Sequence, residues 1–350
     1  MKFLILIHHR FELWNVPDWV LPKLRQEFPN VEFEHFTDYE AATPHLTDAD
    51  AVMTWSLRPD QLAVAKQLRW IHSPAAAVHL LMIPEIINSD IIVTNSSRVH
   101  GPVVAEHAMS LIMSLARRIP SVVRYQQQHV WSQTPLWHDH PRPTEVSGST
   151  LGIIGLGTIG THVAHMAASL GMRIVATRQH PDKGLPKFLN PEKKVAAPLP
   201  EGEGAFHNTG SHKILGPNDI DPLLEESDFV LLSAPLLPNT RAIISADRLA
   251  KMKPDAYIIN VARGALIDTS ALIDALRNRR IGGAALDVFD TEPLPPDSPL
   301  WDLPNILITP HSGAMTSRIW DRHYALLSEN LRRFIANEPL IGVVNKHEGY

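Results

Sequence analysis

The sequence contains no cysteine, and this one absence excludes several kinds of chemistry. Disulfide bonds, thiolate nucleophiles, thiolate metal ligands and iron–sulfur clusters all require a cysteine side chain. Any catalytic group in this chain must therefore come from another residue type. A chain without disulfides is also compatible with a reducing compartment, and we expect a cytoplasmic location.

Long apolar runs and blocks of like charge are missing as well. No run approaches the roughly 18 apolar residues that a membrane span needs. The apolar start, residues 1–7, is too short for a signal peptide and leads into His8-His9-Arg10 without a small-residue cleavage site. The formal net charge of −5 offers no basic surface for a nucleic acid. We therefore expect neither a membrane nor a nucleic acid as a partner.

Short apolar segments alternate with helical stretches along the 350 residues, a length that fits about two domains. Each segment is bounded by polar or turn residues, as buried parallel strands are. The expected strands are residues 3–7, 31–36, 51–54, 69–72, 91–94, 151–154, 173–177, 229–233, 256–260, 284–287 and 306–308. This alternation predicts the α/β class, with two doubly wound parallel-sheet domains.

Two helical patterns suggest how the domains are connected. Residues 102–117 predict a long connecting helix that opens with Pro102, since proline suits the first helical turn. The amphipathic pattern at 316–337 predicts a last helix that returns to the first domain. We therefore predict a discontinuous domain of residues 1–100 and 316–350, and a second domain of residues 101–315. The stretch 181–217 has little periodicity, and we interpret it as an insertion or a mobile loop.

One glycine-rich turn has the spacing of a dinucleotide-binding site. It consists of Gly155, Leu156, Gly157, Thr158, Ile159 and Gly160. An apolar strand leads into it, an alanine-rich helix leads out and a second strand follows, which is the βαβ context that this motif requires. Residues 101–315 are therefore predicted to form a Rossmann-type NAD(P)-binding domain. A plain glycine turn in an α/β domain is the alternative.

The end of the second strand of this unit indicates which dinucleotide is bound. A site for NAD usually carries an acid there, which binds the ribose 2′-hydroxyl. This chain has Thr177 and Arg178, and no acid occurs before Asp182. A guanidinium would attract the 2′-phosphate of NADP. We predict NADP(H) as the preferred cofactor, with NAD possible and a solvated surface role for Arg178 as the alternative.

Three later segments carry functional groups near the ends of expected strands, where ligands bind in open α/β folds. They are residues 259–268 with Arg263, residues 285–294 with Asp287 and Glu292, and residues 308–313 with His311. Together with the glycine turn and the stretches 93–95 and 104–108, these segments resemble the D-isomer-specific 2-hydroxyacid dehydrogenases. The resemblance covers most of the chain.

The resemblance implies hydride transfer between a nicotinamide and C2 of a 2-oxo acid, with three catalytic residues. His311 matches the acid–base histidine, and Glu292 matches the carboxylate that pairs with it and raises its pKa. Arg263 matches the arginine that binds the substrate carboxylate and polarises the carbonyl. Asp287 matches the acid beside the nicotinamide, with a simple strand-end cap as the alternative.

The resemblance also implies a flavodoxin-like substrate domain and a set of ligand contacts. The substrate contacts are Ala76, Ala77, Arg263 and His311. The cofactor contacts, besides the glycine turn, are Thr177, Arg178, Ala234, Pro235, Thr240, Val261, Ala262, Arg263, Asp287, His311 and Gly313. Ala76 and Ala77 stand where the family usually has glycines. Alanine keeps the backbone N–H donors of glycine, but the loop at 73–78 can follow a different path from the family's usual loop. The identity of the substrate therefore stays open.

The leading interpretation is an NADP(H)-preferring enzyme that reduces a small 2-oxo acid, such as glyoxylate or hydroxypyruvate, to the D-2-hydroxy acid. A phosphoglycerate dehydrogenase-like enzyme is one alternative, and a cofactor-sensing binding protein on the same fold is another. Trp131 and Trp137 lie in a loop where related enzymes often build a dimer contact, so we expect a homodimer, with core or surface packing of these side chains as the alternative. The closest histidine groupings, at 138–140 and 162–165, lack a second cluster, and we expect no metal site.

Overall fold

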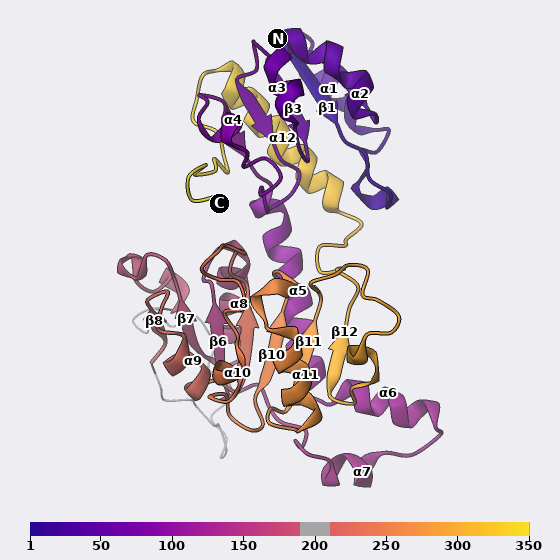
Figure 1. Ribbon diagram of the computed structural model, residues 1–350, viewed down its shortest axis with the longest axis vertical. Coiled ribbons are helices and arrows are strands. Elements are labelled where there is room, and N and C mark those ends of the chain that lie inside the picture. Colours follow the sequence, from indigo (N-terminus) through magenta and orange to yellow (C-terminus); the bar gives the residue numbers. More distant parts are fainter. Residues whose placement is uncertain (190–210, 350) are drawn as a thin grey trace. The chain divides into compact units, whose positions relative to one another are not determined.

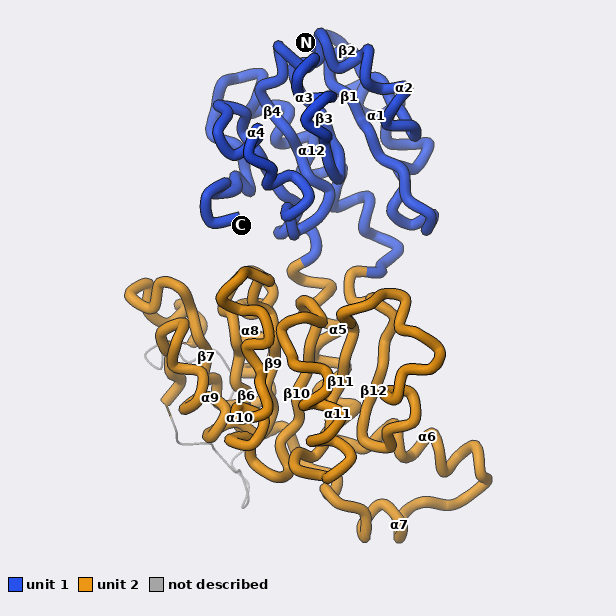
Figure 2. The backbone as a smooth tube through the Cα atoms, in the orientation of Figure 1, with its two compact units in different colours: residues 1–100, 315–350 blue, residues 101–314 orange. Residues whose placement is uncertain are grey.

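The computed structural model of the protein describes residues 1–189 and 211–349. The chain divides into two compact units, shown in different colours in Figure 2. Unit 1 consists of residues 1–100 and 315–350, and unit 2 of residues 101–314. Each unit is built around one parallel sheet with a hydrophobic core on each of its faces. The predicted α/β class with two parallel-sheet domains is confirmed.

Unit 1 contains a five-stranded sheet with the order β2-β1-β3-β4-β5, all parallel. Its strands are β1 (Lys2–Leu6), β2 (Glu32–Phe36), β3 (Ala51–Thr54), β4 (Trp70–His72) and β5 (Ile92–Thr94). On β1, Phe3 and Ile5 pack into one core, and Leu4 and Leu6 into the other. Successive strand residues point to opposite faces, so a strand covered on both sides appears in the sequence as an unbroken apolar run.

Helices cover both faces of this sheet (Figure 1). One core is closed by α1 (Val20–Glu27) and α12 (Ile319–Ile335), and the other by α2 (Tyr39–Ala42), α3 (Pro59–Val64) and α4 (Pro84–Ile87). Short 3-10 turns occupy Glu12–Trp14 and Thr43–Asp48. The chain end also returns to this sheet, because Val343 forms an antiparallel bridge with Thr94.

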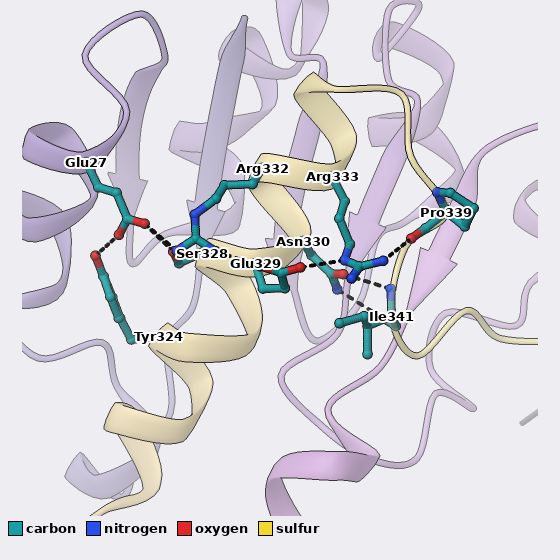
Figure 3. Close-up of polar contacts among 9 residues, drawn as sticks. All are labelled: Glu27, Tyr324, Ser328, Glu329, Asn330, Arg332, Arg333, Pro339 and Ile341. Atoms are coloured by element: carbon teal, nitrogen blue, oxygen red, sulfur yellow. Dashed lines mark hydrogen bonds and ion pairs between the residues drawn. The ribbon is translucent and has the colours of Figure 1, made fainter.

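Polar contacts fix α12 in unit 1, although about 300 residues separate it from α1 along the chain (Figure 3). Glu27, the last residue of α1, accepts hydrogen bonds from three side chains of α12, those of Tyr324, Ser328 and Arg332. Asn330 donates through Nδ2 to Ile341 O at 3.0 Å and accepts from Ile341 N at 2.8 Å. These bonds hold both the helix and the segment that follows it.

Unit 2 contains a seven-stranded parallel sheet with the order β12-β11-β10-β9-β6-β7-β8. The strands are β6 (Thr150–Ile154), β7 (Arg173–Thr177), β8 (Lys213–Leu215), β9 (Phe229–Leu232), β10 (Tyr257–Asn260), β11 (Gly283–Leu286) and β12 (Ile306–Ile308). From β6 the chain runs outward through β7 and β8, and then restarts on the other side at β9. This reversal creates a topological switch point, the usual ligand position of doubly wound folds.

The sheet of unit 2 is covered on one face by α5 (Ser97–Ala116), whose first turn belongs to unit 1, and α8 (Thr158–Ser169). Its other face is covered by α9 (Ile220–Glu226), α10 (Ala246–Leu249) and α11 (Thr269–Arg277). Helices α6 (Ile119–Gln127) and α7 (Gln133–His138) contribute no residue to either core. Further 3-10 turns lie at Pro181–Lys183, Lys187–Leu189, Gly264–Leu266 and Pro299–Asp302. None of the helices in the described ranges is long and apolar enough to span a lipid bilayer.

The structure corrects the prediction for residues 181–217 at one end. Residues 190–210 lie outside the described part, but β8 at Lys213–Leu215 is a regular strand that pairs with β7. The strand is only three residues long and lies at the sheet edge, where Lys213 is exposed and Ile214 is half-buried. Such a segment has too little apolar pattern to be found without its pairing partner.

The start of the long helix is a second correction. Helix α5 begins at Ser97, so Pro102 lies inside it rather than at its first turn. Asn95 Oδ1 accepts a hydrogen bond from Ser97 N at 3.2 Å, and His100 N donates to Ser96 O at 3.3 Å. Asn and Ser are residues that favour helix starts. The run Asn95-Ser96-Ser97 is therefore the sequence signal for this start, and Pro102 follows it inside the helix.

Candidate active site

The glycine turn joins β6 to α8 next to β9, at the switch point of the unit 2 sheet. Gly155 has φ +100°, and a Cβ built there would lie 2.6 Å from the backbone of Ala234. A Cβ on Gly160 would lie 2.5 Å from Gly155 O, whereas nothing lies within 4 Å of one on Gly157. Two of the glycines are therefore needed for the turn itself. Gly157 instead leaves open space before the first amides of α8, where the helix dipole favours an anion.

Neighbouring side chains fix this turn. Thr177 is buried at the end of β7, and its Oγ1 accepts from Gly155 N at 3.2 Å. Ser233 Oγ donates to Gly155 O at 2.8 Å from the end of β9. Thr240, another predicted cofactor residue, closes the loop after β9 by donating to Pro235 O at 2.8 Å. Thr177 thus has a structural role, and Ser233 is a supporting residue that the sequence did not single out.

Arg178 directly follows β7, and its amide donates to Leu215 O of β8 at 3.1 Å. Its side chain is half-buried. Among the residues that the structure describes, its guanidinium makes no hydrogen bond or ion pair with another side chain. Gln179 and His180 beside it are exposed. No described side chain therefore neutralises this charge at the β7–β8 edge of unit 2.

His311 and Glu292 form the closest catalytic pair of the predicted set. His311 Nδ1 donates to Glu292 Oε2 at 2.6 Å, and Glu292 Oε1 accepts from Phe289 N at 2.9 Å. The hydrogen bond to Glu292 raises the pKa of His311 against the opposing effect of burial. Burial alone would raise the pKa of Glu292, but the bonds from His311 and Phe289 outweigh it and lower that pKa. Both shifts favour the charged pair.

Arg263 lies just after β10, on the same sheet edge, and its charge influences both members of this pair. Burial lowers the pKa of Arg263, although Glu292 opposes this effect. The buried Asn260 shapes the turn, because its Nδ2 donates to Arg263 O at 2.8 Å and its Oδ1 accepts from Ala262 N at 3.0 Å. A Cβ on Gly264 would lie 2.1 Å from the carbonyl carbon of Phe289. Asn260 and Gly264 therefore position Arg263 beside the loop of Glu292.

Asp287 is 2% exposed and uses both carboxylate oxygens to hold the loop of His311. Oδ1 accepts from Thr309 Oγ1 at 2.6 Å and from Ser312 N at 2.9 Å, and Oδ2 accepts from Gly313 N at 2.9 Å. His311, with φ +51°, also donates its amide to the carbonyl of Asp287 at 2.8 Å. These bonds tie the histidine's backbone to the end of β11.

His107, on α5, completes the surroundings of Asp287. Its Nε2 lies 3.1 Å from Thr309 Oγ1 and 3.3 Å from Asp287 Oδ1. Burial alone would raise the pKa of Asp287, but the bonds from His107, Thr309 and the amides of the loop outweigh it and lower that pKa. The carboxylate is thus held in its charged form. The sequence pointed to His107 only as part of the motif at 104–108.

The remaining predicted residues fall into two groups. Ala234, Pro235, Val261 and Ala262 lie in the loops that follow β9 and β10, on the same sheet edge as the glycine turn. Ala76 and Ala77 belong to unit 1, in the loop after β4, where both are half-buried. No group of three His, Asp or Glu in residues 1–189 and 211–349 is arranged to hold a metal ion.

Comparison with known proteins agrees with this geometry. Residues 109–197 and 205–313 match the family model described as D-isomer specific 2-hydroxyacid dehydrogenase, NAD binding domain. The chain belongs to the D-isomer-specific 2-hydroxyacid dehydrogenases. A glyoxylate reductase from Korarchaeum cryptofilum is 32% identical over 97% of this chain and 90% of the relative. The resemblance seen in the motifs, and the assignment to a family of NAD(P)-dependent oxidoreductases, are thereby confirmed.

Other members of the family differ in length or cofactor. A D-3-phosphoglycerate dehydrogenase from a Synechocystis strain is 34% identical over 81% of this chain but only 46% of its own length. The chain spans about half the length of the phosphoglycerate dehydrogenases that it matches. An NADPH-dependent glyoxylate/hydroxypyruvate reductase from Sinorhizobium meliloti, whose structure holds NADP and sulfate, has a TM-score of 0.76 and 25% identity. That alignment covers 100% of this chain and 99% of the other.

Proposed function

We propose that this protein reduces a small 2-oxo acid to the corresponding D-2-hydroxy acid and prefers NADPH. The observation that carries the proposal is the short His311–Glu292 pair beside the half-buried Arg263. The bound nicotinamide supplies the hydride that is added to C2 of the substrate. Reduction also needs one proton, which must reach the oxygen on C2 as the carbonyl becomes a hydroxyl.

His311 is the source of that proton in the proposed mechanism. Its Nδ1 is engaged by Glu292, which leaves Nε2 to face the substrate oxygen. The raised pKa keeps the imidazolium populated near neutral pH, and proton transfer is effective when the acid's pKa lies near the working pH. Arg263 binds the substrate carboxylate with its planar fork and stabilises charge that develops on the carbonyl oxygen.

NADPH is preferred because Arg178 lies where the adenosine ribose of a dinucleotide ends. Its guanidinium is not committed to another side chain in the described ranges, so it is available to a 2′-phosphate. The NADP-bound Sinorhizobium meliloti reductase, which aligns along the whole chain, supports the same preference. NAD remains a possible second cofactor, because Gly155–Gly160 bind the pyrophosphate that both dinucleotides share.

Glyoxylate and hydroxypyruvate are the proposed substrates. The Korarchaeum cryptofilum relative of matching length is a glyoxylate reductase, which supports this choice. Phosphoglycerate dehydrogenase activity is a second candidate, favoured by the 34% identity to the Synechocystis protein. A cofactor-sensing binding protein is the non-enzymatic alternative.

One assay separates these functions. Purified protein is incubated with NADPH or NADH and a panel of 2-oxo acids, and with NAD⁺ or NADP⁺ and D-3-phosphoglycerate. The proposal expects fast NADPH oxidation with glyoxylate or hydroxypyruvate, and a lower kcat/KM with NADH. Faster turnover of phosphoglycerate would establish the second candidate. NADPH binding without any turnover would establish the sensing protein.

We also propose that the protein is a homodimer through α6, α7 and their connection. Five large apolar side chains are exposed there, those of Ile119, Val123, Val130, Trp131 and Trp137. Trp131 is 88% exposed, and such apolar surface is common at protein interfaces. Sedimentation of the wild type as a dimer and of Trp131→Glu as a monomer is the expected result. A monomeric wild type would exclude the dimer.

A cytoplasmic location is proposed from the lack of cysteine.

A further inference from the structure

Four consecutive carbonyl groups in the loop after β4 are held by the segment 95–100 of unit 1. Ser96 Oγ donates to Ser73 O at 3.0 Å, His100 Nε2 to Pro74 O at 3.0 Å, Ser96 N to Ala75 O at 2.9 Å, and Asn95 Nδ2 to Ala76 O at 3.0 Å. The donors come from the turn after β5 and the first turn of α5. On this side of the loop, each of these four carbonyl groups therefore accepts a hydrogen bond.

The opposite side of the loop carries free donors. A planar trans peptide points its carbonyl and its N–H in opposite directions. Because the carbonyls of Ala75 and Ala76 point toward residues 95–96, the N–H groups of Ala76 and Ala77 point away from them. No hydrogen bond within the described residues is donated by either group. Two neighbouring amides of this kind make a binding site for an anion.

His100 is buried in a way that packing alone does not explain. Its side chain is 8% exposed, and its Nδ1 has no hydrogen-bond partner in the described part of the chain. A carbonyl only accepts, so the proton lies on Nε2, which donates to Pro74 O, and Nδ1 keeps its lone pair. Burial lowers the pKa of His100, so the ring is neutral near pH 7. An aliphatic residue would fill the same space without burying an unpaired nitrogen.

Neighbouring rings fix the direction of that donor. The ring centroid of His100 lies 6.3 Å from that of Trp14 and 5.4 Å from that of His323 on α12, and both pairs meet edge to face. His323 is 2% exposed, and its ring centroid lies 5.1 Å from that of Trp320. The imidazole is therefore surrounded on several sides and aims Nε2 at one carbonyl.

His72 fixes the second donor, the hydroxyl of Ser96. The only hydroxyl proton of Ser96 goes to Ser73 O, so His72 Nε2 must donate to Ser96 Oγ, at 3.3 Å. His72 Nδ1 then accepts from Thr94 Oγ1 at 2.8 Å. Burial lowers the pKa of His72 to about 4, so this neutral tautomer persists at neutral pH.

We propose that His100 is a positioning residue: by bonding the loop at Ser73–Ala77 from one side, it orients the amides of Ala76 and Ala77, which the family resemblance assigns to the substrate carboxylate. The two adjacent donors match the two oxygens of that carboxylate. This inference rests on the proposed function for the identity of that carboxylate, the one on C1 of the 2-oxo acid. The orientation of the loop does not depend on it.

The test compares His100→Leu, which keeps an apolar side chain but removes the donor, with His100→Gln, which retains an N–H. Losing one hydrogen bond to the loop should raise the KM for the 2-oxo acid about tenfold in His100→Leu. The kcat should change less, and the KM for NADPH should stay the same. His100→Gln should recover part of the loss. His45→Leu is the control, because His45 is a half-buried histidine of the same unit that makes no hydrogen bond to the loop, and melting temperatures confirm that every variant folds.

A second readout needs no turnover. Hydrogen exchange of peptides covering residues 73–80 and 94–100, followed by mass spectrometry, should be faster in His100→Leu than in the wild type and in His45→Leu. Binding of oxamate, an unreactive 2-oxo acid analogue, should weaken about tenfold in the same variant. Unchanged exchange would overturn the positioning role. Faster exchange with unchanged oxamate affinity would overturn the carboxylate site. A wild type that binds oxamate without turning over any 2-oxo acid would refute the proposed function and leave this inference supported.

Discussion

His311 and Glu292 are joined by a hydrogen bond of 2.6 Å between Nδ1 and Oε2, although 19 residues separate them in the sequence. Glu292 comes from the loop after β11 and His311 from the loop after β12, and these two strands are neighbours in the sheet. The pairing therefore follows from the parallel order of the strands. It places the charge state of the histidine under the control of a second residue.

Glu292→Gln should move the pH dependence of reduction. The wild-type pKa of His311 is raised, so the protonated acid is present at low pH and is lost as the pH rises through that pKa. Without the carboxylate the pKa of His311 falls, and the alkaline limb of kcat/KM should shift to lower pH. Asp290→Asn, on the same loop, should leave the limb in place. An identical limb in Glu292→Gln would mean that another group controls the profile.

Arg178→Asp should exchange the cofactor preference. The carboxylate repels a 2′-phosphate and can bind a ribose 2′-hydroxyl, so the ratio of kcat/KM for NADPH to that for NADH should fall by about a hundredfold. Arg277→Asp, on α11, provides the same charge change away from the glycine turn. If the ratio of kcat/KM for NADPH to that for NADH is the same in Arg178→Asp and Arg277→Asp, Arg178 does not recognise the phosphate.

Two glycines of one turn should respond differently to alanine. Gly155→Ala should destabilise unit 2 by about 1–3 kcal/mol, because the backbone has φ +100° and the methyl group would meet Ala234. Gly157→Ala meets no atom within 4 Å and should leave the melting temperature unchanged. The same methyl group should raise the KM for NADPH about tenfold, because it occupies the open space before α8. Thermal melts and steady-state kinetics test both, and a destabilised Gly157→Ala would refute the distinction.

Glu27 should make the stability of unit 1 sensitive to acid. Burial alone would raise the pKa of Glu27, but hydrogen bonds from Tyr324, Ser328 and Arg332 outweigh it and lower that pKa. A lowered carboxylate pKa means that the stabilisation is present above the pKa of the unfolded chain and is lost as the pH falls through the folded pKa. Glu27→Gln should therefore cost about 1–2 kcal/mol at pH 7 and much less near pH 3, measured by urea unfolding. Glu338→Gln is the control, because this acid in unit 1 is exposed and its carboxylate makes no hydrogen bond or ion pair within the described residues. A loss that is equal at both pH values would exclude this ionic contribution.

Part of this protein follows from short stretches of sequence. The strands at Phe229–Leu232 and Ile306–Ile308 and the turn at Gly155–Gly160 each carry their pattern within a few residues, because apolar periodicity and glycine conformation are local properties. The same holds for Arg178, whose charge at the end of β7 predicts a cofactor preference from position alone.

Other features depended on partners far away in the chain. Strand β8 exists because β7 pairs with it, and His107 meets Thr309 across 202 residues. The resemblance pointed to Asp287 as the acid beside the nicotinamide, and the structure adds that both of its oxygens hold the loop of His311. His100 is one of 19 histidines in the sequence, and only the structure shows that it bonds the loop at 73–77. Sequence patterns determined most of the strands and the family of this protein. Only the tertiary structure decided which donors meet which acceptors, because hydrogen bonds act over about 3 Å and fix no sequence spacing.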